Sequence, residues 1–154
     1  MTDPSTIPIV ELLPHGPNMI VIDRLVTYGA NKSVARATVR RSSKFFDGAG
    51  VPSWAGIEYM AQTVAAHAGF EARLRGLTPA LGFLLGTRAY ECCAPEFPLG
   101  AELAITAEPL FLENGLASFR CAIEHHAPLA RAVINTYRPG DDEIARLKSR
   151  AAAR

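Results

Sequence analysis

The chain has 154 residues, and its 16 Lys and Arg against 15 Asp and Glu leave a formal net charge of +1. This length fits one domain whose core needs no disulfide or metal, and the balanced charge without a basic run argues against a nucleic-acid partner. No apolar run reaches the roughly 18 residues of a membrane span. Asp3, Pro4 and Pro8 interrupt the start, where a signal peptide would be apolar, so we expect a soluble, cytoplasmic protein.

The first part of the chain predicts a short helical entry and a β-hairpin. Residues 7–13 have helical character, which Pro14 and Pro17 end because proline cannot continue a helix. Residues 19–28 (MIVIDRLVTY) are rich in β-branched side chains, which favours a strand. A polar turn follows. In residues 34–41 apolar and polar side chains partly alternate, which predicts the strand that pairs with residues 19–28.

A long apolar helix is predicted from Ile57 onward. Apolar and small residues recur on one helix face at Met60, Ala61, Val64, Ala65 and Ala68. The opposite face is hardly more polar, and a helix that is apolar nearly all round is buried within its domain. The helix ends near Gly76 and Pro79.

The rest of the chain predicts strands. Strand-like runs lie at residues 80–91, 102–112, 116–125 and 129–137. Asn114-Gly115 between two of them is a strong hairpin signal. The order of two strands, one helix and four strands indicates an α+β domain over residues 1–140, with an antiparallel sheet wrapped around the helix. Residues 141–154 predict a peripheral helix or a disordered tail.

Glu58 is the one acidic residue in the first turn of the apolar helix. A helix N-terminus favours an anion by only about 0.3–1 kcal/mol, whereas burial raises a carboxyl pKa by up to about 3–5 units. If Glu58 is buried, desolvation dominates and the side chain keeps its proton near neutral pH, as a general acid must. The simpler interpretation is a carboxylate that stabilises the first helical turn.

No metal site is predicted. Cys92, Cys93 and Cys121 have neither CxxC spacing nor the pattern of a disulfide framework. His125 and His126 are adjacent, and neighbouring strand residues point to opposite faces, so turn residues are the better interpretation.

Two motifs carry a family resemblance. The first is LLPHGPNMIVIDRL at residues 12–25, and the second is EYMAQ at residues 58–62, with FFDG between them. From about Leu12 to Tyr137 the chain resembles the hotdog-fold 3-hydroxyacyl-[acyl carrier protein] dehydratases of the FabZ type. The resemblance implies a hotdog fold and a dimer with a continuous sheet and shared active sites. It also implies an acyl carrier protein or coenzyme A thioester as substrate, and no cofactor.

The resemblance also implies site roles. In that family a loop histidine removes the α-proton of the acyl thioester, and the helix acid protonates the departing β-hydroxyl. Glu58 would be the acid, and the Gly56 amide would hold the thioester carbonyl. The remaining substrate-binding candidates are Gln62, Trp54, Phe46 and Ala55, where Gln62 either orients Glu58 or satisfies a buried polar group.

The chain departs from the FabZ pattern at the catalytic base. Ala49 lies where the loop histidine would fall, and the loop is shorter, which looks more like the ApeP-like branch linked to aryl polyene synthesis. Members of that branch work with a second FabZ-like dehydratase, so the resemblance implies a base from another subunit, with His15 as the second candidate. A non-catalytic acyl-thioester-binding subunit and a hotdog thioesterase remain as alternatives.

Overall fold

The computed structural model describes residues 3–78 and 82–153. Within them, helix α1 spans Gly56–Leu74 and helix α2 spans Asp141–Ala152. The strands are β1 Arg24–Thr27, β2 Ser33–Thr38, β3 Gly50–Pro52, β4 Phe83–Cys92, β5 Glu96–Pro98, β6 Glu102–Glu113, β7 Leu116–His125 and β8 Ala127–Tyr137. Short 3-10 helices are η1 Pro4–Thr6, η2 Ile9–Glu11, η3 Pro17–Met19 and η4 Ser53–Ala55.

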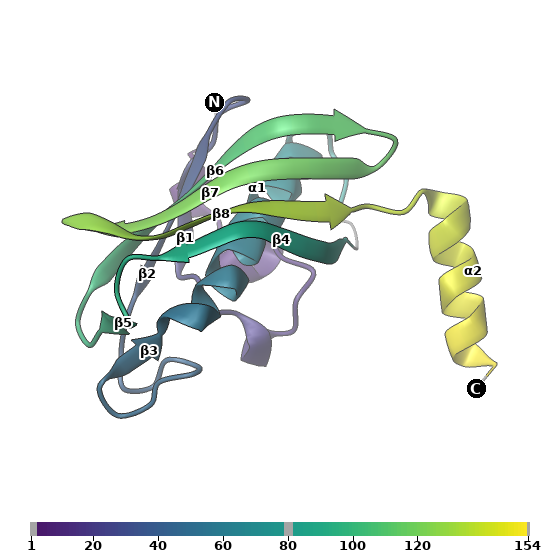
Figure 1. Cartoon of the computed structure of the whole chain (residues 1–154). Coiled ribbons are helices and arrows are strands. Elements are labelled where there is room, and N and C mark those ends of the chain that lie inside the picture. Colours follow the sequence, from purple (N-terminus) through teal and green to yellow (C-terminus); the bar gives the residue numbers. More distant parts are fainter. Residues whose placement is uncertain (1–2, 79–81, 154) are drawn as a thin grey trace.

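One antiparallel sheet covers α1 as a curved layer (Figure 1). Its strand order is β1-β2-β6-β7-β8-β4. Ile105 of β6 lies opposite Ala35 of β2 and Ile123 of β7, so buried side chains of neighbouring strands align on the inner face. This arrangement confirms the predicted α+β architecture of an antiparallel sheet around one long helix.

The core lies between the inner face of the sheet and α1. Met60, Tyr59 and Phe70 of the helix are buried against the inward-facing residues of the sheet. Each large apolar side chain contributes about 1.5–3 kcal/mol when it leaves water. The other side of α1 is covered by the N-terminal segment through Leu12 and Leu13, which explains why the helix sequence is apolar nearly all round.

The predicted strand at residues 19–28 is wrong in its first half. Only β1, from Arg24, pairs with β2, and the chain before it forms η3 after Pro17 and then an irregular stretch. Its backbone bonds to a side chain instead of to a strand: the Val21 N–H donates to Gln62 Oε1, and Gln62 Nε2 donates to the Met19 carbonyl. The β-branched composition of this stretch reflects burial rather than sheet pairing.

A second, two-stranded sheet was not predicted. Strands β3 and β5 pair antiparallel through Val51 and Phe97. A Cβ at Gly50 would come within 2.3 Å of the Phe97 carbonyl oxygen, so glycine permits this close pairing. The short sheet fixes the loop just before α1.

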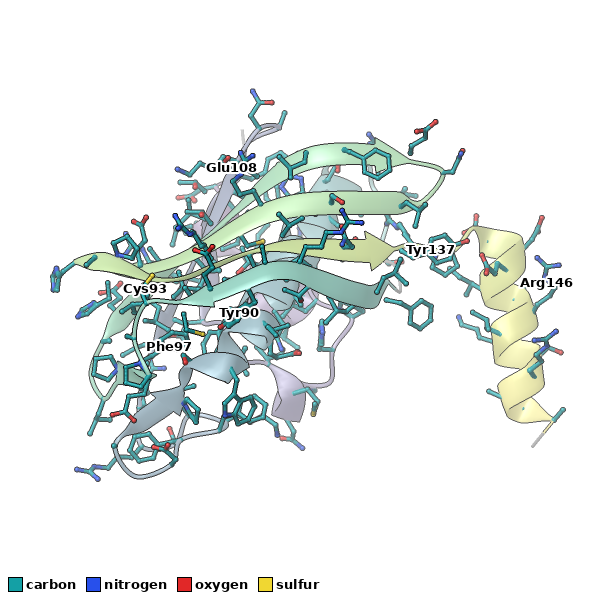
Figure 2. The ribbon with its side chains drawn as sticks, in the orientation of Figure 1. Tyr90, Cys93, Phe97, Glu108, Tyr137 and Arg146 are labelled. Atoms are coloured by element: carbon teal, nitrogen blue, oxygen red, sulfur yellow. The ribbon has the colours of Figure 1, made fainter. Side chains whose placement is uncertain are left out.

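The C-terminal segment forms a helix, α2, that stands apart from the sheet (Figure 1). None of its residues is buried. Tyr137, at the end of β8, points toward α2, and its hydroxyl group donates to the Glu143 carboxylate (Figure 2). Neither α1 nor α2 is long and apolar enough to cross a membrane. The described residues contain no group of three or more metal-binding side chains.

Candidate functional site

The N-terminal segment runs against α1 and brings His15 to the helix. Gly69 makes this approach possible, because a Cβ there would lie 1.9 Å from the Leu12 carbonyl oxygen. Leu12 and Leu13 are buried. The next residues, Pro14 to Gly16, form a bend outside any helix or strand. His15, which belongs to no helix or strand, is thus held beside the first turns of α1.

His15 and Glu58 lie together. The distance from His15 Nε2 to Glu58 Oε1 is 4.0 Å, and the two side chains are 28% and 34% exposed. The other ring nitrogen, Nδ1 of His15, is enclosed and has no hydrogen-bond partner. The general-acid interpretation of Glu58 depended on a buried side chain, and in the single chain the carboxyl group is partly buried and faces an open cavity. The single chain alone therefore does not desolvate it fully.

Gln62 holds Glu58 in place. Its side chain is fully buried, and Nε2 donates to Glu58 Oε1 at 2.9 Å and to the Met19 carbonyl at 2.8 Å. Its Oε1 accepts from the Val21 N–H at 2.8 Å. Gln62 therefore does both things that the sequence left open: it orients the acid and satisfies buried polar groups. Gln62 does not line the cavity at Glu58, and its expected part in substrate binding stays a prediction.

The Gly56 amide is already occupied. Gly56 directly follows η4, and its N–H donates to the carbonyl of Ser53, the first residue of that turn. The prediction of a free amide that holds the substrate carbonyl is therefore wrong. Gly56 and Ala55 are buried, and Gly56 faces the core against Tyr90, Phe97 and Ile123.

Tyr90 reaches the start of α1 from β4. Its hydroxyl group donates to the same Ser53 carbonyl, and burial raises its pKa, so the phenol stays a hydrogen-bond donor near neutral pH. The strand is bulged beside it, where Ala89 has a φ of 50°. This contact fixes the turn before α1, and no sequence motif predicts it.

Trp54 and Phe46 do not line the cavity at Glu58. Trp54 is 61% exposed and its ring meets that of Phe45 at 5.4 Å, edge to face. Phe46 is half-buried. Both belong to the surface around the loop before α1, and their expected part in substrate binding stays a prediction.

A cavity of about 150 Å³ opens beside His15 and Glu58. Small side chains of α1, Ala61, Ala65 and Ala68, form one wall, and the start of β4 forms another. Gly82, Phe83 and Leu84 belong to this second wall, so the glycine-containing run at residues 82–86 lies beside the site. The end of β8, residues 136–138, completes the lining. Sequence reasoning missed it, because nothing in a strand end shows that it will lie next to α1.

The loop that carries a histidine in FabZ-type enzymes has no ionisable group at that position here. Ala49 is exposed, and its N–H and that of Gly50 donate to Asp47 Oδ1. The acid and base groups that line the cavity near the helix start are therefore Glu58 and His15.

Comparison with known proteins identifies the family. A family model described as ApeP-like, ApeP dehydratase, matches residues 7–148. A chain in the dehydratase heterocomplex ApeI:P from Xenorhabdus doucetiae is similar over 92% of this chain and 97% of its own, with 30% identity and a TM-score of 0.83. No protein with a curated description matches.

More distant structures share the hotdog fold alone. A hypothetical thioesterase with coenzyme A from Streptococcus pneumoniae has 11% identity and a TM-score of 0.60, over 75% of this chain and 84% of its own. The PaaI protein of the phenylacetic acid degradation operon from E. coli has 14% identity and a TM-score of 0.58, over 74% and 81%. The α+β hotdog fold is thereby confirmed. With its family match and a 30% identical relative over nearly the whole length, the chain belongs to the ApeP-like dehydratase family.

Proposed function

We propose that this chain eliminates water from a 3-hydroxyacyl thioester, with Glu58 as general acid and His15 as general base. The observation that carries the proposal is the 4.0 Å approach of His15 Nε2 to Glu58 Oε1 on the wall of one cavity. Elimination needs an acid and a base within reach of two adjacent carbon atoms, and this pair supplies both. Sequence reasoning ranked His15 second, and its position beside Glu58 now favours it.

The proton transfers follow from the geometry. Neutral His15 takes the α-proton, the electron pair of that bond forms the Cα–Cβ double bond, and the β-hydroxyl leaves with a proton from Glu58 as water. The thioester acidifies the α-proton, so no cofactor is required. Elimination leaves an imidazolium and a carboxylate at ion-pair distance, and return of the proton from His15 to Glu58 resets the site.

A companion subunit is the second part of the proposal. Strand β4 is the edge of the sheet, and Phe83, Leu84 and Leu85 at its start are 41%, 44% and 58% exposed. An apolar edge strand is a template for pairing with another chain. The similar protein from Xenorhabdus is described as a dehydratase heterocomplex. We therefore infer that a second hotdog dehydratase, or a second copy, continues the sheet along β4, in the cytoplasm, where acyl carrier protein or coenzyme A thioesters are made.

The same partner offers an alternative source of the base. Ala49 cannot remove a proton, so a histidine of the companion could serve in place of His15. A purely stabilising or acyl-binding subunit is a further candidate, and the missing loop histidine favours it.

The test is a product assay on a 3-hydroxyacyl carrier protein, with the chain alone and with its companion. The proposal predicts that an enoyl thioester is formed. Glu58→Gln and His15→Ala should each lower its rate of formation by about 100-fold or more. Full activity of His15→Ala in the complex would assign the base to the companion. Unchanged activity of both variants would leave a stabilising subunit, and a free acid as product would indicate a thioesterase. Ser118→Ala, on β7, is the matched control.

A further inference from the structure

A second cavity lies under the C-terminal half of α1. Its volume is about 220 Å³, and it is lined by the helix, the end of β6, the start of β7 and the residues after β1. It is open to solvent beside Leu112, and Tyr28, Phe111 and Phe119 give its wall an aromatic part. Nothing in the proposed proton transfers uses this space, which we name the distal chamber.

The distal chamber adjoins the cavity at Glu58. Val64, Ala68 and Thr136 line both spaces, together with Arg138. The two helix residues among them are small, so the partition between the cavities on the α1 side is thin. His67 lies nine positions after Glu58, which is about 14 Å along the helix. A chain that begins beside Glu58 and follows α1 arrives at the distal chamber.

His67 gives the chamber a polar group. The residue is 6% exposed, and its Nδ1 lies 2.7 Å from Ser33 Oγ. Its ring also contacts the rings of Tyr28 and Phe119 at 5.0 and 5.6 Å. Nε2 forms no hydrogen bond within the described residues, and His67 lines the chamber, so Nε2 is the ring nitrogen left for a ligand there.

The protonation state of His67 follows from its surroundings. Burial lowers its pKa, against a smaller opposing effect of Glu71, so the ring is neutral near neutral pH. A neutral imidazole whose Nδ1 is paired with a hydroxyl group presents one hydrogen-bonding nitrogen. The chamber therefore combines apolar and aromatic side chains with the uncharged imidazole of His67, and its charged lining residues are Glu71 and Arg138.

We infer that the distal chamber receives the far end of the acyl chain, and that His67 selects chains whose far end carries a hydrogen-bonding group such as a hydroxyl. This inference rests on the proposed function, since the acyl chain enters from the cavity at Glu58. A plain alkyl end packs against the aromatic side chains but leaves His67 Nε2 without a hydrogen-bond partner. A hydroxyl end pairs with it, which makes His67 a specificity-determining residue.

The experiment measures binding rather than turnover. The full-length chain, with its companion where one is required, is titrated with three non-hydrolysable 3-hydroxyacyl pantetheine amides. One is a short butanoyl probe, one a dodecanoyl probe, and one the same dodecanoyl chain with a terminal hydroxyl group. We expect the hydroxyl-ended probe to bind about fivefold more tightly than the alkyl-ended one, the value of one net hydrogen bond.

Substitutions separate the two cavities. Ala117→Phe, in a residue that lines the distal chamber and not the cavity at Glu58, fills the chamber and weakens both long probes by tenfold or more while the short probe keeps its affinity. Ala65→Phe, which lines only the cavity at Glu58, is the matched control and weakens all three probes. His67→Phe keeps the affinity for the alkyl-ended probe and removes the fivefold preference for the hydroxyl.

A measurement on the unsubstituted protein guards against misfolded variants. The ¹⁵N resonance of His67 Nε2 shifts with the hydroxyl-ended probe and not with the short one. If the short probe binds and neither long probe gains affinity or moves that resonance, the chamber assignment is overturned while the proposed function stands. If no probe binds, acyl binding at Glu58 fails, and the chamber assignment falls with it.

Discussion

Replacing Gly69 with alanine is a direct test of how closely the N-terminal segment approaches α1. The added Cβ would lie 1.9 Å from the Leu12 carbonyl oxygen, 2.9 Å from its carbonyl carbon and 3.3 Å from its Cα. These are backbone atoms, which cannot rotate away as the end of a side chain can. Overpacking of a core costs about 1–3 kcal/mol, and this contact belongs at the upper end.

Helix propensity acts in the opposite direction. Glycine in a helix interior is about 1 kcal/mol less favourable than alanine. The net expectation for Gly69→Ala is therefore a loss of about 2 kcal/mol in the free energy of unfolding, which corresponds to a fall in Tm of about 4–8 °C for a chain of this size. Without the Leu12 contact, the same substitution would stabilise the protein.

Urea unfolding followed by circular dichroism measures the difference. Ala65→Gly, in the same helix, reports the propensity effect alone to a first approximation and is expected to cost about 1 kcal/mol. A Gly69→Ala protein as stable as the unsubstituted chain, or more stable, would refute the close approach of Leu12. It would also remove the reason for placing His15, three residues later, beside Glu58.

Further outcomes follow from single contacts. Gln62→Leu preserves volume but leaves the Val21 N–H unpaired, so the unfolding free energy falls by about 1–3 kcal/mol and kcat falls while KM changes little; urea unfolding and kinetics measure both. Tyr90→Phe loses the hydrogen bond to the η4 backbone and costs about 1 kcal/mol in the same unfolding assay. Because burial lowers the pKa of His67, the unfolded chain binds a proton near pH 6.5 that the folded chain does not. Stability is therefore highest above about pH 6.5 and declines as the pH falls through it, and urea titrations of His67→Phe should show a flatter profile. Removal of residues 141–154 changes the free energy of unfolding from urea titrations by about 0.5 kcal/mol or less, because α2 buries no residue.

The sequence predicted the elements whose signals are local. Helix α1 was evident from its apolar spacing, and the β6–β7 hairpin from Asn114-Gly115, whose φ values of 53° and 83° have the positive sign that such a turn requires. The strand-like runs at residues 102–112 and 116–125 likewise correspond to β6 and β7. These features depend on residues a few positions apart, so a single sequence contains them.

The features that the sequence did not show depend on contacts between distant residues. Val21 looked like a strand residue because it belongs to a β-branched run, yet its N–H bonds to a glutamine 41 positions away. The Gly56 amide looked free because a helix start leaves amides unpaired in general. A preceding 3-10 turn supplies the missing acceptor, and Tyr90 from β4 reinforces it. Pairing of β3 with β5 likewise needs Gly50 to meet Phe97.

The incomplete burial of Glu58 connects the site to assembly. In the single chain its carboxyl group is 34% exposed, and the apolar residues Phe83 and Leu84 at the mouth of the same cavity are exposed as well. A subunit that pairs along β4 would cover those apolar side chains and exclude water from the cavity at once. Exclusion of water favours the neutral carboxyl group over the carboxylate, and the neutral group is the one that can protonate a leaving hydroxyl. Gln62 already fixes the direction of the carboxyl group, so assembly has only to remove the water around it. The proposed companion subunit and the proposed acid function of Glu58 therefore depend on the same exposed apolar surface at the start of β4.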